Sequence, residues 1–430
     1  MADIKTGVED ISSVSKRVRV EIPSEMVGEF FKKELEKCAK TAEIKGFRKG
    51  KAPLSIVEQH YMHDIVKGTV SNLIESTYLD AIAKEGLAPI SEPSIEPGTF
   101  DRDGPFSYSL TFEVYPSVEI KGYKELRLTQ PEVVVTDDEV EKGLEELRER
   151  AAYLEPLPDG ACADAGVVLT VDISGSLVGD INKRHDSKDV TIELGKGALL
   201  KQVEDGLKGA KVGEERTIRV DYPNDFHDKG LAGKTWIYKV KIKDMKKKIL
   251  PPLTDELAKE LGDYKSLEEL KTQVKDSIVS AKNRGAMMRL ADEALFKLIA
   301  DNKFEVPPSM VMGELRRMYL ELADRLSARG QKPEDVGITA EGFINENLGV
   351  AETRTRVIII LDAIARQENI EVLDGEVDAR LEAIANEIKQ PFDKVKKYYE
   401  SHNFIDEVRA RIRREKAIDL ILKLATSSAT

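Results

Sequence analysis

The pattern of hydrophobic and polar residues in the first part of the chain predicts two strands and two helices. Residues 14–22 alternate and indicate a strand, after which a proline and a serine favour a helix running to about residue 44. Residues 54–84 repeat the helical period, and residues 106–114 alternate strictly, as in a strand or hairpin. Residues 1–118 are therefore predicted to form one α+β domain.

The rest of the chain changes its pattern twice. Residues 119–159 carry a charged helix between prolines, which is typical of a linker. Residues 160–248 show short apolar runs between glycine-rich turns, with one short helix at 201–207, and predict an antiparallel β domain. From residue 249 to 430 the helical period returns. The expected fold class is thus multidomain α+β, ending in an all-α domain with helical arms.

Composition and charge limit the classes of protein that fit. The chain has 430 residues, which suggests roughly three domains. Its net charge of −12 repels nucleic acid and anionic membranes unless positive charge gathers locally. No stretch approaches the roughly 18 apolar residues that a membrane span needs, and Cys38 and Cys162 are too few for a disulfide framework. We expect a cytoplasmic protein without contact to membranes.

Positive charge does gather in the second half of the first predicted helix and in the loop after it. Residues 32–51 contain eight basic and three acidic residues, and the loop GFRKGKAP places an aromatic side chain among cations. Its glycines allow positive φ, so the loop can project from the domain. Arginine and lysine suit phosphates, while an aromatic side chain suits an apolar pocket of a protein partner. The alternative is an ordinary solvated basic loop. The candidate docking residues are Gly46, Phe47, Arg48, Lys49, Gly50 and Lys51.

This loop, between two helices, resembles the ribosome-docking signature of the trigger factor family of bacterial chaperones. Residues 191–197, 203–209 and 231–234 resemble a prolyl isomerase domain of the FKBP type, and residues 250–256 and 306–311 resemble junctions of the family's helical domain. The resemblance implies docking on the large ribosomal subunit beside the exit tunnel, through ribosomal protein and RNA. It also implies nascent and unfolded polypeptides as clients, help with folding and export, and a homodimer away from the ribosome.

The FKBP resemblance also implies a prolyl pocket. Isomerising an X-Pro bond needs no nucleophile or cofactor; it needs a dry, shaped pocket and a donor for the amide carbonyl. The family carries aromatic side chains at three positions that are aliphatic here, and another in a loop at 180–183. We therefore expect the fold with weak or absent isomerase activity. Alternatively, these side chains form an ordinary aliphatic core. The candidate pocket comprises Ile173, Val190, Val203, Phe226, Tyr238 and a backbone donor at Leu200.

Methionine is concentrated in the predicted helical domain. Five of nine methionines fall between residues 287 and 318, where flexible side chains could adapt to many clients or simply fill gaps in a core. The candidate client contacts are Met287, Met288, Met310 and Met318. No metal site is expected, because His60 and His63 lack further ligands.

Two other functions remain open at this stage. A stand-alone prolyl isomerase would keep its pocket aromatics, and an RNA-binding protein would bind naked RNA with a steep dependence on salt. The depleted pocket aromatics weigh against the stand-alone isomerase, and the negative net charge weighs against the RNA-binding protein.

Overall fold

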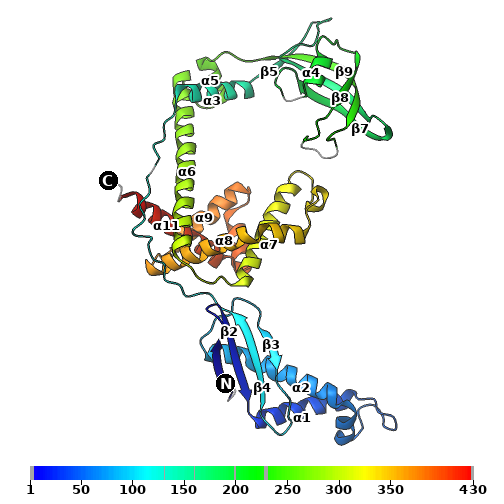
Figure 1. Ribbon diagram of the computed structural model, residues 1–430, viewed down its shortest axis with the longest axis vertical. Coiled ribbons are helices and arrows are strands. Elements are labelled where there is room, and N and C mark those ends of the chain that lie inside the picture. The colour runs from blue at the N-terminus through cyan, green and yellow to red at the C-terminus, as the bar shows by residue number, and fades with distance from the viewer. Residues whose placement is uncertain (1–3, 130, 159, 198–199, 227–230, 428–430) are drawn as a thin grey trace. The chain divides into compact units, whose positions relative to one another are not determined.

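The computed structural model describes residues 4–427 apart from 130, 159, 198–199 and 227–230. The chain divides into two compact units, residues 1–130 with 287–430 and residues 131–286 (Figure 1). The first unit holds an α+β domain and a helical body. The second holds a β domain with its supporting helices. The predicted α+β class is confirmed.

The N-terminal domain is an antiparallel sheet with two helices on one face. The strand order is β1-β2-β4-β3, and β2 pairs with β4 so that Val18 faces Leu110 and Ile22 faces Phe106. Inward side chains of these strands pack against Val27 of α1 and Leu73 of α2. The elements are β1 (Lys5–Asp10), β2 (Ser15–Ile22), α1 (Ser24–Thr41), α2 (Leu54–Lys84), β3 (Ser94–Pro97) and β4 (Phe106–Glu113).

The first helix ends earlier than its sequence pattern predicts. It stops at Thr41 rather than near Ile44, because Ala42 leaves the helical conformation with φ −58° and ψ 132°. Ala42 and Ile44 are then buried with Val57 of α2 in a small core. Burial of this non-helical segment outweighs the local preference to continue the helix.

The helical body packs its helices around one apolar core. Ile120 and Leu128, from the stretch predicted as a linker, are buried in that core beside Leu298 and Ile364. The helices are α7 (Pro308–Ser327), η1 (Pro333–Val336), α8 (Ala340–Gln367), α9 (Asp374–Glu387), α10 (Phe392–Ser401), α11 (Ile405–Ser427) and the end of α6 (Leu267–Asp301).

The second unit is built on a five-stranded antiparallel sheet. The order is β5-β9-β6-β7, with β8 also pairing with β9. Its strands are longer than the sequence pattern predicts, and the expected loop at 180–183 lies at the start of β7, where Asp180 pairs with Leu177 of β6. The elements are β5 (Tyr153–Pro156), β6 (Val167–Leu177), β7 (Asp180–Glu193), α4 (Lys201–Leu207), β8 (Glu215–Asp221) and β9 (Thr235–Ile249).

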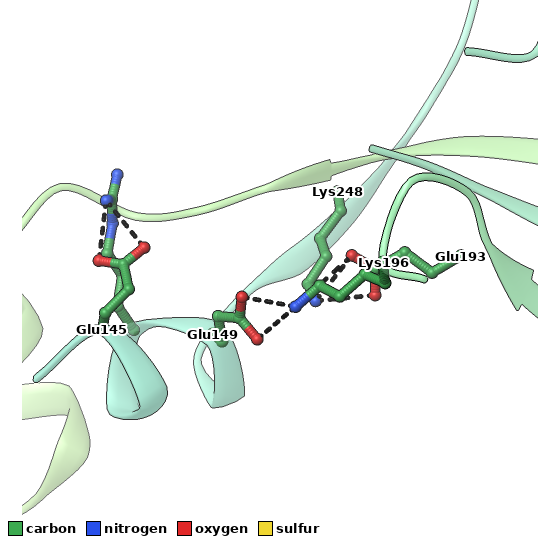
Figure 2. Close-up of polar contacts among 6 residues, drawn as sticks. Glu145, Glu149, Glu193, Lys196 and Lys248 are labelled. Atoms are coloured by element: carbon green, nitrogen blue, oxygen red, sulfur yellow. Dashed lines mark hydrogen bonds and ion pairs between the residues drawn. The ribbon is translucent and has the colours of Figure 1, made fainter. Parts of the chain in front are cut away.

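A helical support adjoins this sheet in the same unit. Leu144 of α3 (Asp137–Arg150) packs with Ala258 of α5 (Asp255–Leu261) and with Leu270 and Val274 of α6. The far end of α3 is joined to the β domain by charge. Figure 2 shows Glu149 bound to Lys196, in the loop after β7, with Glu193 and Lys248 beside them.

Candidate functional site

The basic loop between α1 and α2 is held firmly at its base and exposed at its tip. Ile44 and Ala52, on either side of it, pack into the small core beneath. Gly46 and Gly50 adopt φ of +98° and +72°. The Gly50 amide donates to the Ala42 carbonyl at 3.3 Å, and a Cβ at Gly50 would lie 2.8 Å from the Lys40 carbonyl oxygen. The loop therefore requires glycine at residue 50, both for its positive φ and because a Cβ would clash with the Lys40 backbone.

The side chains at the tip are available to a partner. Phe47 is 41% exposed, and Arg48 and Lys51 are exposed. Within the described part of the chain, the Arg48 side chain makes no hydrogen bond or ion pair. Lys49 instead binds Glu43 at 2.6 Å, and this contact lowers the pKa of Glu43 and raises the pKa of Lys49. The tip thus presents an aromatic ring and two cations, Arg48 and Lys51, whose side chains pair with none of the described residues.

Tyr61 connects this loop to a kink in α2. Its hydroxyl donates to the Glu43 carbonyl at 3.1 Å and accepts from the Glu43 amide at 3.4 Å. Tyr61 has φ −120° and ψ 20°, the one non-helical conformation within α2. The sequence pattern carries no signal for this contact, because residues 43 and 61 lie on different elements.

The predicted prolyl pocket corresponds to a cavity of about 600 Å³ in the β domain. Four of the six residues proposed for it line the cavity together: Ile173 of β6, Val190 of β7, Val203 of α4 and Tyr238 of β9. Further aliphatic lining comes from Ile192, Leu231 and Val240. Arg184, His185 and Ser187 of β7 supply the polar lining.

The other two proposed pocket residues, Leu200 and Phe226, are not among the residues that line this cavity. Leu200 precedes α4, and its carbonyl accepts hydrogen bonds from the amides of Val203 and Glu204 at 2.8 and 3.2 Å. The Phe226 ring meets the Tyr222 ring edge-on, with centroids 4.8 Å apart. Phe226 therefore supports Tyr222.

Sequence reasoning missed two aromatic side chains of the cavity, Tyr222 and Trp236. The hydroxyls of Tyr222 and Tyr238 lie 2.8 Å apart, and the Trp236 and Tyr238 rings are stacked at 6.0 Å. Burial, followed by the contact with Tyr222, raises the pKa of Tyr238. Alternation along β9 could have found Trp236, since it lies two residues before Tyr238 and so on the same face.

The four proposed client-binding methionines differ in exposure. Met288 is 68% exposed and Met287 38%, both on α6. Met310 is half-buried at the start of α7, and Met318 is 8% exposed in the core between α7 and α8. Phe296, two turns beyond Met288 on α6, is 74% exposed. No group of metal-binding side chains occurs among the described residues, and no helix there is long and apolar enough to cross a membrane.

Comparisons with known proteins agree along the whole chain. The family described as "Bacterial trigger factor protein (TF)" matches residues 4–147, and its C-terminus matches residues 266–423. The family described as "FKBP-type peptidyl-prolyl cis-trans isomerase" matches residues 160–243, the segment that contains the cavity.

Relatives at full length give the same result. The trigger factor of Geotalea daltonii is 36% identical over 424 residues and covers 98% of each chain, and that of Geobacter metallireducens is 36% identical over 419 residues and covers 97%. A solved structure described as "Promiscuous Substrate Recognition in Folding and Assembly Activities of the Trigger Factor Chaperone" shares the fold, with TM-score 0.53, 22% identity, and coverage of 97% of this chain and 99% of that one. The chain belongs to the trigger factor family.

Proposed function

We propose that this protein is a cytoplasmic chaperone that docks on the large ribosomal subunit beside the exit tunnel and shields emerging polypeptides. The exposed loop at residues 46–51 carries this proposal. Its base is anchored in a core, while Phe47 is 41% exposed and the Arg48 side chain makes no hydrogen bond or ion pair among the described residues. A rigid base with an open tip lowers the entropy lost on binding.

The chemistry of the loop fits a surface made of both RNA and protein. Arg48 and Lys49 can neutralise phosphates, and Phe47 can enter an apolar pocket of a ribosomal protein. The chain as a whole carries −12, so attraction to RNA relies on local positive charge, such as the eight basic against three acidic residues of 32–51. A localised basic patch favours one docking orientation.

Clients would contact apolar side chains that the helical body leaves exposed. Met288 and Phe296 extend from α6 into solvent, and Met287 and Met310 are partly accessible. Flexible methionine and aromatic side chains can pack against many sequences without a fixed geometry. Met318 is instead buried in the core between α7 and α8.

The β domain has the fold of a prolyl isomerase, and we propose that its turnover is weak or absent. The supporting observation is the aliphatic wall of Ile173, Val190 and Val203, where the family carries aromatic rings. Aliphatic side chains enclose a prolyl ring less tightly on that side. Robust turnover of a proline peptide in a protease-coupled assay would overturn this part of the proposal.

Co-sedimentation with vacant ribosomes tests the docking loop. The variant Phe47→Ala/Arg48→Ala/Lys49→Ala removes one exposed apolar side chain and two cations. A matched control, Lys67→Ala/Lys275→Ala/Leu79→Ala, removes the same kinds of exposed side chain on α2 and α6, outside the basic stretch of residues 32–51. Circular dichroism establishes that both are folded.

We expect the native chain and the control to sediment with ribosomes and the loop variant to remain in the supernatant. Equal sedimentation of all three proteins would mean that the ribosome contact lies outside the loop. No sedimentation by any of them would overturn docking itself.

A further inference from the structure

The helix that follows the docking loop, residues 46–51, is kinked close to its start. Tyr61 leaves the helical conformation, so residues 54–60 form a short helical segment ahead of the main part of α2. Val57 of this segment packs beside Ile44 in the small core beneath the loop. Neither proline nor glycine occurs in residues 55–67, so the kink has another cause.

The contacts of the Tyr61 side chain account for the kink. Its ring packs in the small core, and its hydroxyl reaches the backbone of Glu43, donating to the carbonyl at 3.1 Å and accepting from the amide at 3.4 Å. Residue 43 lies outside any helix or strand, so these backbone groups have no ladder of their own to join. The Tyr61 hydroxyl therefore fixes the direction in which the chain leaves α1 and enters the docking loop.

A second contact holds the short segment from the opposite end of the domain's sequence. Arg102, in the connection between β3 and β4, binds Glu58 at 2.6 Å, and its guanidinium lies 5.0 Å from the ring centroid of Phe31 on α1. Phe100 of the same connection stacks on Phe31 at 6.1 Å. The Glu58 side chain is only 22% exposed, so water and salt screen this ion pair less than a fully exposed one. Arg102 thus joins the two helices that carry the loop.

We propose that Tyr61 and the Arg102–Glu58 pair are positioning groups that aim the docking loop at its partner. The inference rests on the proposed docking of residues 46–51 and extends the docking unit to residues 54–60. Both groups act through the loop rather than by contact with the ribosome. While they hold the loop, most molecules carry its tip in the binding geometry. Without them only a fraction does, and the apparent affinity falls in proportion to that fraction.

Tyr61→Phe tests the hydroxyl, because it keeps the ring in the core. Binding of the full chain to vacant ribosomes, measured by co-sedimentation over a range of protein concentrations, should weaken about 3- to 10-fold. Tyr78→Phe is the matched control. Tyr78 is half-buried on the same helix, and its hydroxyl makes no hydrogen bond within the described part of the chain, so this variant should bind as the native chain does.

Glu58→Gln separates positioning from charge. Removing a negative charge near a basic loop would by itself strengthen binding to RNA. Loss of the ion pair with Arg102 should instead weaken binding about 2- to 5-fold. Glu75→Gln, at an exposed glutamate of the same helix that makes no ion pair with any described residue, is the control and should not weaken binding. Stronger binding by Glu58→Gln than by its control would overturn the role of the ion pair.

Two further measurements distinguish positioning from a general loss of stability. In Tyr61→Phe, hydrogen exchange at the amides of Phe47 and Gly50, which bind the carbonyls of Ile44 and Ala42, should speed up about 3- to 10-fold, while exchange in β2 and β4 stays unchanged. Tyr61→Phe should also weaken ribosome binding less in an Arg48→Ala background, because less contact then depends on the aim of the loop. Unchanged exchange at the loop amides, or a fully additive loss, would overturn the positioning role of Tyr61.

The outcomes keep this inference apart from the proposed function. If Tyr61→Phe and Glu58→Gln bind as the native chain does, while Phe47→Ala/Arg48→Ala/Lys49→Ala does not bind, the positioning groups are wrong and the docking loop stands. If the native chain itself does not bind ribosomes, docking and this inference are both wrong.

Discussion

The hydroxyl of Tyr115 donates a hydrogen bond of 2.7 Å to the carboxylate of Asp362, 247 residues further along the chain. Arg414 of α11 binds the same carboxylate at 2.8 and 3.1 Å, and the Arg366 guanidinium lies 5.6 Å from the Tyr115 ring centroid. Tyr115 precedes the segment at 118–128 that crosses the helical core. This contact therefore secures the entry of that segment into the helical body.

Tyr115→Phe should loosen the segment without unfolding the protein. Losing a hydrogen bond to a charged acceptor that keeps Arg414 should cost about 1–2 kcal/mol locally. Hydrogen exchange at the amides of Ile120 and Leu128, which are bound to Gln367 and Ala425, should speed up roughly 5- to 30-fold. Tyr153→Phe serves as control. Unchanged exchange in Tyr115→Phe would assign the anchoring to other contacts.

The same tyrosine gives a prediction for alkaline pH. Burial, and then the Asp362 charge, raises the pKa of Tyr115. A group with a raised folded-state pKa contributes stability below its unfolded pKa of about 10 and loses it as the pH rises through the folded value. We expect stability to fall above about pH 10, and less steeply in Tyr115→Phe. If the free energy of unfolding, measured with urea at each pH, fell equally with pH in the two proteins, this prediction would be contradicted.

The two glycines of the docking loop should tolerate alanine to different extents. Both have positive φ, but a Cβ at Gly46 meets nothing within 4 Å, whereas one at Gly50 meets the Lys40 backbone at 2.8 Å. Gly46→Ala should cost about 1–2 kcal/mol of backbone strain in the loop, and Gly50→Ala should add a steric shift of the tip. Ribosome co-sedimentation should fall further for Gly50→Ala. The opposite order would mean that tip geometry does not limit docking.

The Glu43–Lys49 ion pair should restrain ribosome binding. Glu43 occupies Lys49, and it adds a negative charge beside the loop. Glu43→Gln should free the Lys49 ammonium and raise affinity about 2- to 5-fold at low salt, with the gain shrinking as salt screens the charges. Glu36→Gln on α1 removes an equal charge at another exposed position and serves as control. Equal gains in ribosome affinity from both variants would mean that net charge, and not the release of Lys49, causes the effect.

The exposed apolar residues of α6 should determine how well the protein protects unfolded clients. Met288→Ser/Phe296→Ser removes two side chains that are 68% and 74% exposed. This variant should suppress aggregation of a chemically unfolded client several-fold less well, because apolar contact drives such binding. Leu79→Ser, 64% exposed on α2, should behave as the native chain. Equal protection by all three would place client binding elsewhere.

Local pattern in the chain was enough for the elements and for the basic loop, while the docking role proposed for that loop comes from the family resemblance. Alternation and helical period predict β2, α2 and β4, and the loop at residues 46–51 can be recognised because all of its side chains lie in one short segment. Four of the cavity residues follow from the family resemblance. The elements and the basic loop depend on neighbours along the chain, so they can be read from residue types and spacing.

Contacts between distant segments required the folded structure. The Tyr222–Tyr238 pair joins β9 to the loop before it, and Tyr115 meets Asp362 across 247 residues. Whether Met288 is exposed and Met318 buried depends on which helices pack together, since both are methionines on amphipathic helices. Burial and hydrogen bonding between elements arise only when the elements pack, and residue spacing carries no record of which surfaces meet.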